Sequence, residues 1–228
     1  MSRSILSVLC FILVPGLCLV GLYNIQTARF HSHVDFEAPW PEVSAIPFGS
    51  LVTLRHLSAS GNYLHSHSRV YPEGSRQQQV SLVPERIAAT KWRVYNASAN
   101  YSTRTRDALQ HPRLPIPDAS TLKLEHVVTG KHLHSHDILP PVSKDKYLQE
   151  VSAYGFPGFV GDANDSWDLE LTEDSAVLTM ASPVRLRHML TGCFLSAGGT
   201  LPEWGLGLRE VICTRGAVGD LWLIEEAL

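Results

Sequence analysis

The sequence SLVTLRH at residues 50–56, followed by GNYLHSH at 61–67, decides the fold because its pattern returns twice along the chain. The second occurrence is STLKLEH at 120–126 with TGKHLHSH at 129–136, and the third is SPVRLRH at 182–188 with TGCFL at 191–195. Each occurrence is followed by a short segment in which Gln or Glu precedes valine: QQQV at 77–80, QEV at 149–151 and REV at 209–211. A tryptophan comes next (Trp92, Trp167 or Trp222). The strand-ending histidines lie 70 and 62 residues apart, and their distances to the tryptophans are 36, 41 and 34 residues. The chain therefore contains an internal threefold repeat.

Each repeat is predicted to fold as short β-strands. Residues 51–55, 122–126 and 184–188 alternate apolar and polar side chains, which is the period of a half-buried strand. Gly61, Gly130 and Gly192 follow as turn residues. Because three repeats with open strand edges gain by closing on one another, we expect one all-β closed domain with pseudo-threefold symmetry over residues 47–227. Its repeats span about 47–110, 114–172 and 180–227, with the three tryptophans as core anchors.

Composition narrows the class of protein. The chain has 228 residues, of which 44% are hydrophobic, so it is not a wholly disordered polypeptide. This length suits one large domain, or one domain with an appendage. A formal charge of −3 argues against non-specific nucleic-acid binding, which needs a cationic surface. Four cysteines are too few for a disulfide-dense scaffold.

The N-terminal segment is predicted to be a hydrophobic helix at residues 1–25. Residues 5–23 carry no charge, and the length of this apolar stretch is close to that of a membrane-spanning helix. Two interpretations stay open, an uncleaved membrane anchor and a cleaved signal peptide, and both send the remainder into the endoplasmic reticulum lumen. Residues 26–46, with Pro39 and Pro41 and no regular period, are expected to be a linker.

Two further features agree with a lumenal location. Three sequons mark possible N-glycosylation at Asn96, Asn100 and Asn164. Cys193 and Cys213 lie in the same repeat, and a disulfide between them is compatible with an oxidising compartment. Whether their Cα atoms approach within ~7 Å is a question for the structure.

Paired histidines are the candidate functional residues. In an extended strand His65 and His67 point to one face, as do His134 and His136. A structural role is open because buried polar groups are normally paired. A ligand-contact role, together with Gln78 and Gln79, is also open because imidazole and amide groups both donate and accept hydrogen bonds. A metal role is disfavoured because no third ligand recurs at a fixed offset.

The third repeat lacks the histidine pair and has Ser196 and Ala197 instead, so we expect functional use in the first two repeats. Asp162 and Asp165 precede a predicted strand and are expected to cap a turn. The sequence contains no nucleophile elbow, phosphate-binding glycine loop or Cys-x-x-Cys motif. We therefore predict no catalytic residues, no cofactor and no metal in this chain.

Several segments resemble the MIR motif, which protein O-mannosyltransferases share with inositol trisphosphate and ryanodine receptors. The resemblance implies a β-trefoil from about residue 46 to residue 226. It is closest to the lumenal domain of the dolichyl-phosphate-mannose–protein mannosyltransferases, because TGC and LPEWG separate the third repeat from the small stromal-cell-derived-factor-like proteins. The segments are PFGSLVTLRH at 47–56, YLHSH at 63–67, YP at 71–72, QQQV at 77–80, NDSW at 164–167, TGC at 191–193 and LPEWG at 201–205.

The resemblance implies a lumenal module at the endoplasmic reticulum membrane that binds acceptor polypeptide or glycan beside other mannosyltransferase subunits. Enzymes of this family have many spanning helices and an acidic Asp-Glu pair in their first lumenal loop. This chain matches neither feature, so no position here receives a catalytic role. The alternative is a free-standing lumenal binding protein of the stromal-cell-derived-factor type. A complete mannosyltransferase is disfavoured, because transfer from a lipid carrier needs a membrane-embedded site.

Overall fold

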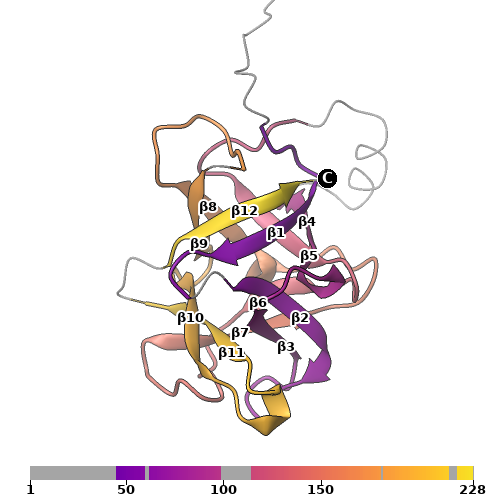
Figure 1. Cartoon of the computed structure of the whole chain (residues 1–228), viewed down its shortest axis with the longest axis vertical. Coiled ribbons are helices and arrows are strands. Elements are labelled where there is room, and N and C mark those ends of the chain that lie inside the picture. Colours follow the sequence, from indigo (N-terminus) through magenta and orange to yellow (C-terminus); the bar gives the residue numbers. More distant parts are fainter. Residues whose placement is uncertain (1–44, 60–61, 99–113, 181, 216–219, 228) are drawn as a thin grey trace, which may run out of the picture. The chain divides into compact units, whose positions relative to one another are not determined.

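The computed structural model describes residues 45–59, 62–98, 114–180, 182–215 and 220–227, all within one compact unit, Pro41–Leu228 (Figure 1). The predicted hydrophobic helix at 1–25 lies outside the described residues, as does nearly all of the predicted linker. Within the described ranges, no helix combines the length and the apolar character needed to cross a membrane.

The prediction of an all-β fold is confirmed, because the described elements are antiparallel strands and three short 3₁₀ turns. The strands of the first repeat are β1 (Leu51–His56), β2 (Tyr63–Val70), β3 (Gln78–Val83) and β4 (Trp92–Asn96). Those of the second are β5 (Thr121–His126), β6 (His132–Ser135), β7 (Leu148–Tyr154) and β8 (Trp167–Leu171). Those of the third are β9 (Pro183–His188), β10 (Phe194–Thr200), β11 (Arg209–Thr214) and β12 (Trp222–Ala227). The 3₁₀ turns are η1 (Ala88–Thr90), η2 (Ala163–Asp165) and η3 (Glu203–Gly205).

The first and last strands of the repeats form a closed barrel. Pairing runs β1–β4–β5–β8–β9–β12 and returns from β12 to β1, so each strand has a neighbour on both sides. The middle strands form three hairpins, β2–β3, β6–β7 and β10–β11, which pair with one another through β3, β7 and β11. In Figure 1 the barrel strands occupy the upper half of the domain and the hairpins the lower half. This is the closure expected of repeats that would otherwise expose strand edges.

A ring of backbone hydrogen bonds joins the segments that precede β1, β5 and β9. Ile46 N donates to Leu178 O (2.8 Å), Leu178 N to Ile116 O (2.8 Å), and Ile116 N to Ile46 O (3.0 Å). All three side chains are buried in the hydrophobic core. Ile46 is the boundary residue between the expected linker at 26–46 and the region of resemblance that begins at about residue 46, and its backbone and side chain take part in this ring.

The three repeated tryptophans connect the barrel to the hairpins. Trp92, Trp167 and Trp222 are 0% exposed. Their indole Nε1 atoms each donate to a hairpin carbonyl at 3.1 Å, and the acceptors are Leu64 O, Leu133 O and Leu195 O. Each tryptophan thus combines a large buried apolar surface with a satisfied polar group, as buried indoles require.

Candidate ligand-binding site

The strand-ending histidines hold neighbouring repeats together. The ring of His126 lies 5.0 Å from that of Trp92, and its Nε2 is 3.0 Å from the carbonyl oxygen of Ala89 in η1. His188 repeats this arrangement with Trp167 and Asn164 O, and His56 does so with Trp222 and the carboxylate of Asp220. All three rings are buried, so their role is structural.

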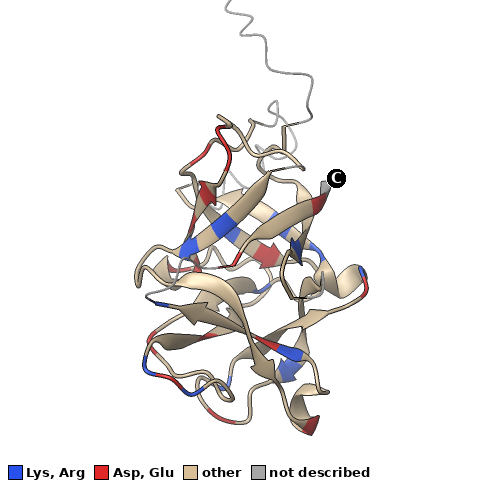
Figure 2. Ribbon diagram, turned by 60° about the vertical axis from the view of Figure 1, so that its left-hand side comes forward, with Lys and Arg blue, Asp and Glu red and all other residues tan. Residues whose placement is uncertain are grey.

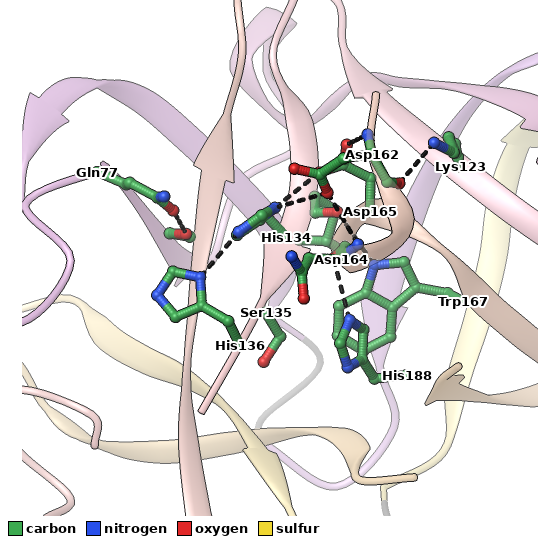
Figure 3. A network of polar contacts seen from close by, with 12 residues as sticks. Gln77, Lys123, His134, Ser135, His136, Asp162, Asn164, Asp165, Trp167 and His188 are labelled. Atoms are coloured by element: carbon green, nitrogen blue, oxygen red, sulfur yellow. Dashed lines mark hydrogen bonds and ion pairs between the residues drawn. The ribbon is translucent and has the colours of Figure 1, made fainter. Parts of the chain in front are cut away.

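A chain of three polar side chains lies in the second repeat (Figure 3). His134 on β6 is 2% exposed, and its Nδ1 lies 2.8 Å from Oδ1 of Asp165. Its other nitrogen, Nε2, lies 2.8 Å from Nδ1 of His136. The chain therefore runs from a buried carboxylate through a buried imidazole to the half-buried ring of His136.

The 3₁₀ turn η2 positions the carboxylate of this chain. Asp162 caps the turn by accepting from Asn164 N (2.8 Å), while Asp165 reaches back to accept from Asp162 N (2.6 Å). The turn-capping role predicted for the two aspartates is confirmed. Lys123 on β5 donates from Nζ to Asp162 O (2.6 Å) and fixes the same turn to the barrel.

His134, Asp162 and Asp165 also offer ligand atoms within 4.8 Å of one another, a spacing that could hold a metal ion. The capping bonds and the imidazole bond already account for this geometry. The first repeat has Ile87 and Thr90 at the corresponding places in η1, so the set does not recur there. We assign no metal to it.

The first repeat presents its histidines differently. His65 is 6% exposed, and its Nδ1 lies 3.1 Å from Ser81 Oγ on β3. His67 is half-buried, and its Nδ1 accepts from the backbone N–H of Arg69 (3.1 Å). Burial lowers the pKa of His65 to about 4 and also lowers the pKa of His67 and His136, so these rings are neutral at pH 7.

Gln78 and Gln79 occupy internal positions. Gln78 Nε2 donates to Ser66 Oγ (2.8 Å) and to Thr129 Oγ1 (3.0 Å) of the second repeat. Gln79 Nε2 donates to Val70 O (2.7 Å). Both residues are buried, which differs from the ligand-contact role that the sequence predicts. Their amides link strands and repeats instead, and of the predicted contact residues only His67 and His136 are partly exposed.

The third repeat has no histidine at the two positions that His65 and His67 occupy in the first repeat. Leu195 lies opposite Cys213 as Leu64 lies opposite Leu82, so Ser196 and Gly198 take the places of His65 and His67. Placing Ala197 there was wrong by one residue.

The loop between β6 and β7 covers this part of the third repeat. Ser143 Oγ accepts from Gly199 N (3.0 Å), and the carboxylate of Glu210 accepts from Val142 N (3.1 Å) and Ser143 N (3.0 Å). A Cβ at Gly198 would lie 2.9 Å from Glu210 Oε2. A side chain at position 198 would therefore collide with Glu210, which holds this loop.

An aromatic cluster that the sequence analysis missed lies beside His134. The ring of Tyr154 is 5.0 Å from that of His134, and the ring of Phe159 is 5.9 Å from Tyr154 and 5.3 Å from Phe156. Phe156 is 63% exposed and Tyr154 is 40% exposed. The segment GFPGF at 155–159 was the available signal, since two aromatic residues between glycines stand at the end of a strand. Aromatic faces next to imidazoles suit ligands that combine apolar and polar groups.

The remaining predicted sites are placed as follows. Cys193 and Cys213 form a disulfide with a Cα–Cα distance of 5.3 Å. Asn96 is exposed at the end of β4, and Asn164 lies in η2. Asn100 lies outside the described residues. Figure 2 shows acidic and basic residues interspersed over the strands and loops, in keeping with a formal charge of −3 for the chain.

A closed barrel joined to three hairpins, built from three repeats, defines an all-β domain of internal threefold repetition. The chain belongs to the MIR domain family, whose profile matches residues 62–224. It is 40% identical to dolichyl-phosphate-mannose–protein mannosyltransferase 1 of Saccharomyces cerevisiae, over 82% of this chain and 24% of that protein. It is 36% identical to protein O-mannosyl-transferase 2 of Danio rerio, over 83% and 25%. The chain thus spans about a quarter of the length of these relatives.

Two solved structures are similar to the domain. The S. cerevisiae protein O-mannosyltransferase Pmt1–Pmt2 complex bound to the sugar donor matches with a TM-score of 0.71 and 36% identity, over 86% of this chain and 27% of that chain. The SDF2-like protein from Arabidopsis thaliana matches with a TM-score of 0.69 and 26% identity, over 81% of this chain and 97% of that chain.

Proposed function

We propose that this chain is the lumenal MIR module of a protein O-mannosyltransferase, that its barrel and hairpins form a β-trefoil, and that it binds acceptor polypeptide or glycan without catalysing transfer itself. The observation that carries the proposal is identity of 40% to a mannosyltransferase across 201 residues. That match covers the three repeats rather than a single motif. We place the module on the lumenal side of the endoplasmic reticulum membrane.

The chemistry of the second repeat supports a binding role. His136 is the half-buried end of a buried polar chain, and the exposed rings of Tyr154 and Phe156 lie on the same repeat. Imidazoles provide hydrogen bonds, and aromatic faces provide apolar contact for a sugar ring or a side chain. A few such contacts contribute only about 0.5–1.5 kcal/mol each, so we expect binding in the millimolar to micromolar range.

The match to the Pmt1–Pmt2 complex supports a second part of the proposal, that the module works beside mannosyltransferase subunits. In that setting a weak site gains from proximity, because a tethered ligand has a high effective concentration. The alternative is a free-standing binding protein, which the SDF2-like match favours since it covers 97% of that chain.

An NMR titration tests the binding role. The ¹⁵N-labelled full chain in detergent would be titrated with methyl α-mannoside and, separately, with a Ser/Thr-rich peptide. We expect shifts centred on β2 and β6, and loss of these shifts in a His67→Ala/His136→Ala variant. Lys144→Ala is the matched control, because Lys144 is exposed on the loop between β6 and β7 and pairs only with Glu73 among described residues. Unchanged binding by the folded double variant would refute the site.

Detergent dependence separates the two functions. A chain that keeps its N-terminal hydrophobic segment should need detergent to stay dispersed, as expected for a membrane-bound module. A chain that is purified from a secretory host without this segment, and without detergent, would favour the free-standing binding protein.

A further inference from the structure

The polar chain of the second repeat determines which nitrogen of each imidazole carries a proton. A carboxylate only accepts hydrogen bonds, so the proton of their hydrogen bond lies on Nδ1 of His134, and Asp165 Oδ1 is the acceptor. With this proton as the only one on the His134 ring, its Nε2 atom has a lone pair and accepts from Nδ1–H of His136. By the same reasoning, Nε2 of His136 is left as a hydrogen-bond acceptor.

In the first repeat, an internal hydrogen bond places the proton of His67 on the other ring nitrogen, Nε2. The backbone N–H of Arg69 donates to Nδ1 of His67, so this nitrogen holds the lone pair. A neutral His67 therefore carries its proton on Nε2, which is a donor. His65 does not alter this result, since the hydroxyl of Ser81 can either donate to its Nδ1 or accept from it.

The internal hydrogen bonds leave one nitrogen of each ring over, Nε2 of His67 and Nε2 of His136. In the described part of the chain, Nε2 of His67 and Nε2 of His136 are shielded from solvent and make no hydrogen bond. Buried polar groups are normally paired, so each nitrogen is a place where an entering group would gain a hydrogen bond. Both histidines are half-buried, so part of each residue lies at the surface beside its shielded nitrogen.

We propose that the two histidine surfaces have opposite hydrogen-bonding polarity: His136 accepts from a ligand hydroxyl, whereas His67 donates to a ligand oxygen that has no proton to give. The presence of a ligand rests on the proposed function, but the polarity rests on the internal hydrogen bonds and on a His134 ring that carries a single proton. A sugar ring suits His136 because its hydroxyls donate hydrogen bonds, and the ring of Tyr154, which contacts His134, lies on the same repeat. An ether, ring or carbonyl oxygen suits His67.

Imidazole NMR tests the polarity without any ligand. Long-range ¹H–¹⁵N correlation at pH 7.5 on the ¹⁵N-labelled full chain in detergent distinguishes the two neutral tautomers. We expect protonated Nδ1 at His134 and His136 and protonated Nε2 at His67. Protonated Nε2 at His136 in the wild type would overturn the proposal.

The Asp165→Asn variant sharpens this test. Its amide oxygen must still accept from Asp162 N, so its NH₂ group would donate to Nδ1 of His134. Both rings of the second repeat should then switch to protonated Nε2, while His67 stays unchanged. Asp162→Asn is the matched control: Asp162 Oδ1 lies 3.9 Å from His134 Nδ1, beyond hydrogen-bond distance, so this variant removes a nearby charge and a capping carboxylate but keeps the 2.8 Å bond to Asp165. Unswitched tautomers in a folded Asp165→Asn variant contradict the proposal, and if that variant does not fold, the wild-type spectrum decides.

A pair of ligands tests the consequence for binding. Methyl α-mannoside should shift the ring signals of His136, whereas its fully O-methylated derivative, which keeps acceptor oxygens but has no O–H donor, should bind this ring at least about tenfold more weakly. Equal shifts of His136 with both ligands overturn the polarity. No shift of either ring with the mannosides or with the Ser/Thr-rich peptide, with the tautomers as expected, would instead refute the proposed binding function while the polarity stands. Shifts with a Ser/Thr peptide alone would assign the hydroxyl to a side chain rather than a sugar.

Discussion

The indole Nε1 of Trp167 donates a hydrogen bond to the carbonyl oxygen of Leu133 over 3.1 Å. This bond ties the last barrel strand of the second repeat, β8, to its own hairpin. The same bond occurs in the other two repeats at the same distance. One indole donor therefore links barrel and hairpin at the same place in each repeat, in addition to the strand pairings β1–β2, β5–β6 and β9–β10.

Trp167→Phe tests this connection. Phenylalanine has no N–H group and is smaller than tryptophan. The buried carbonyl of Leu133 would therefore lose its donor, and a cavity would form. We expect the free energy of unfolding to fall by about 2–4 kcal/mol in urea denaturation. Trp204→Phe is the control, because Trp204 is partly exposed and lies at the edge of the Tyr71 ring. Equal losses in both variants would contradict the proposed role.

Buried histidine should make the domain less stable in mild acid. Burial lowers the pKa of His65 to about 4, whereas a histidine in the unfolded chain titrates near pH ~6.5. The unfolded state therefore binds more protons between these values, and stability decreases as the pH falls from 6.5 to 4. Burial raises the pKa of Glu150, which acts in the opposite direction in the lower part of this interval.

The His65→Asn variant isolates this contribution. Asparagine can keep a hydrogen bond to Ser81 but does not titrate, so the loss of unfolding free energy between pH 7 and pH 4.5 should be smaller by about 2 kcal/mol. Urea denaturation at the two pH values measures it. An unchanged pH dependence would show that His65 is not the group responsible.

Glycine at position 198 should be required for the loop between β6 and β7 to pack against the third repeat. A Cβ there would lie 2.9 Å from both Glu210 Oε2 and Ile212 Cγ2, so Gly198→Ala should lower the free energy of unfolding by about 1–3 kcal/mol. At Gly199 the nearest atoms would lie at 3.4 Å, an ordinary contact, so Gly199→Ala should change stability by less than about 0.5 kcal/mol. The reverse order in thermal or urea unfolding would refute this explanation.

The disulfide should contribute through the loop that it closes. Cys193 and Cys213 are 20 residues apart, so removal of the bridge should cost about 3 kcal/mol by the chain-entropy relation. A Cys193→Ala/Cys213→Ala variant and the reduced wild type should show the same lowered urea midpoint. If reduction left the wild-type midpoint unchanged, the bridge would not stabilise the domain.

The strands and the tryptophans were predictable because local alternation and threefold repetition both appear in the sequence. The ring of Ile46, Ile116 and Leu178 was missed, although Ile-Pro occurs before two of the repeats. Its recognition depends on backbone bonds between segments more than 60 residues apart. Such long-range contacts leave little local signal.

The chemistry of the site was harder to predict than its location. Sequence alternation places His134 and His136 on one face, but the carboxylate that orients them is 31 residues away from His134. One signal was available: Asp165 and Asp220 both stand two residues before a repeated tryptophan, and both contact a histidine. The covering of the third repeat could not be predicted, because it depends on where the loop between β6 and β7 folds back.

The pairing of β1 with β12 has a consequence for protein architecture. Val52, near the start of β1, lies opposite Ala227, at the end of β12, so the polypeptide enters and leaves the domain at adjacent points. A unit of this kind can be inserted into a loop of a larger protein without separating the flanking segments. Such an insertion requires only two neighbouring junctions.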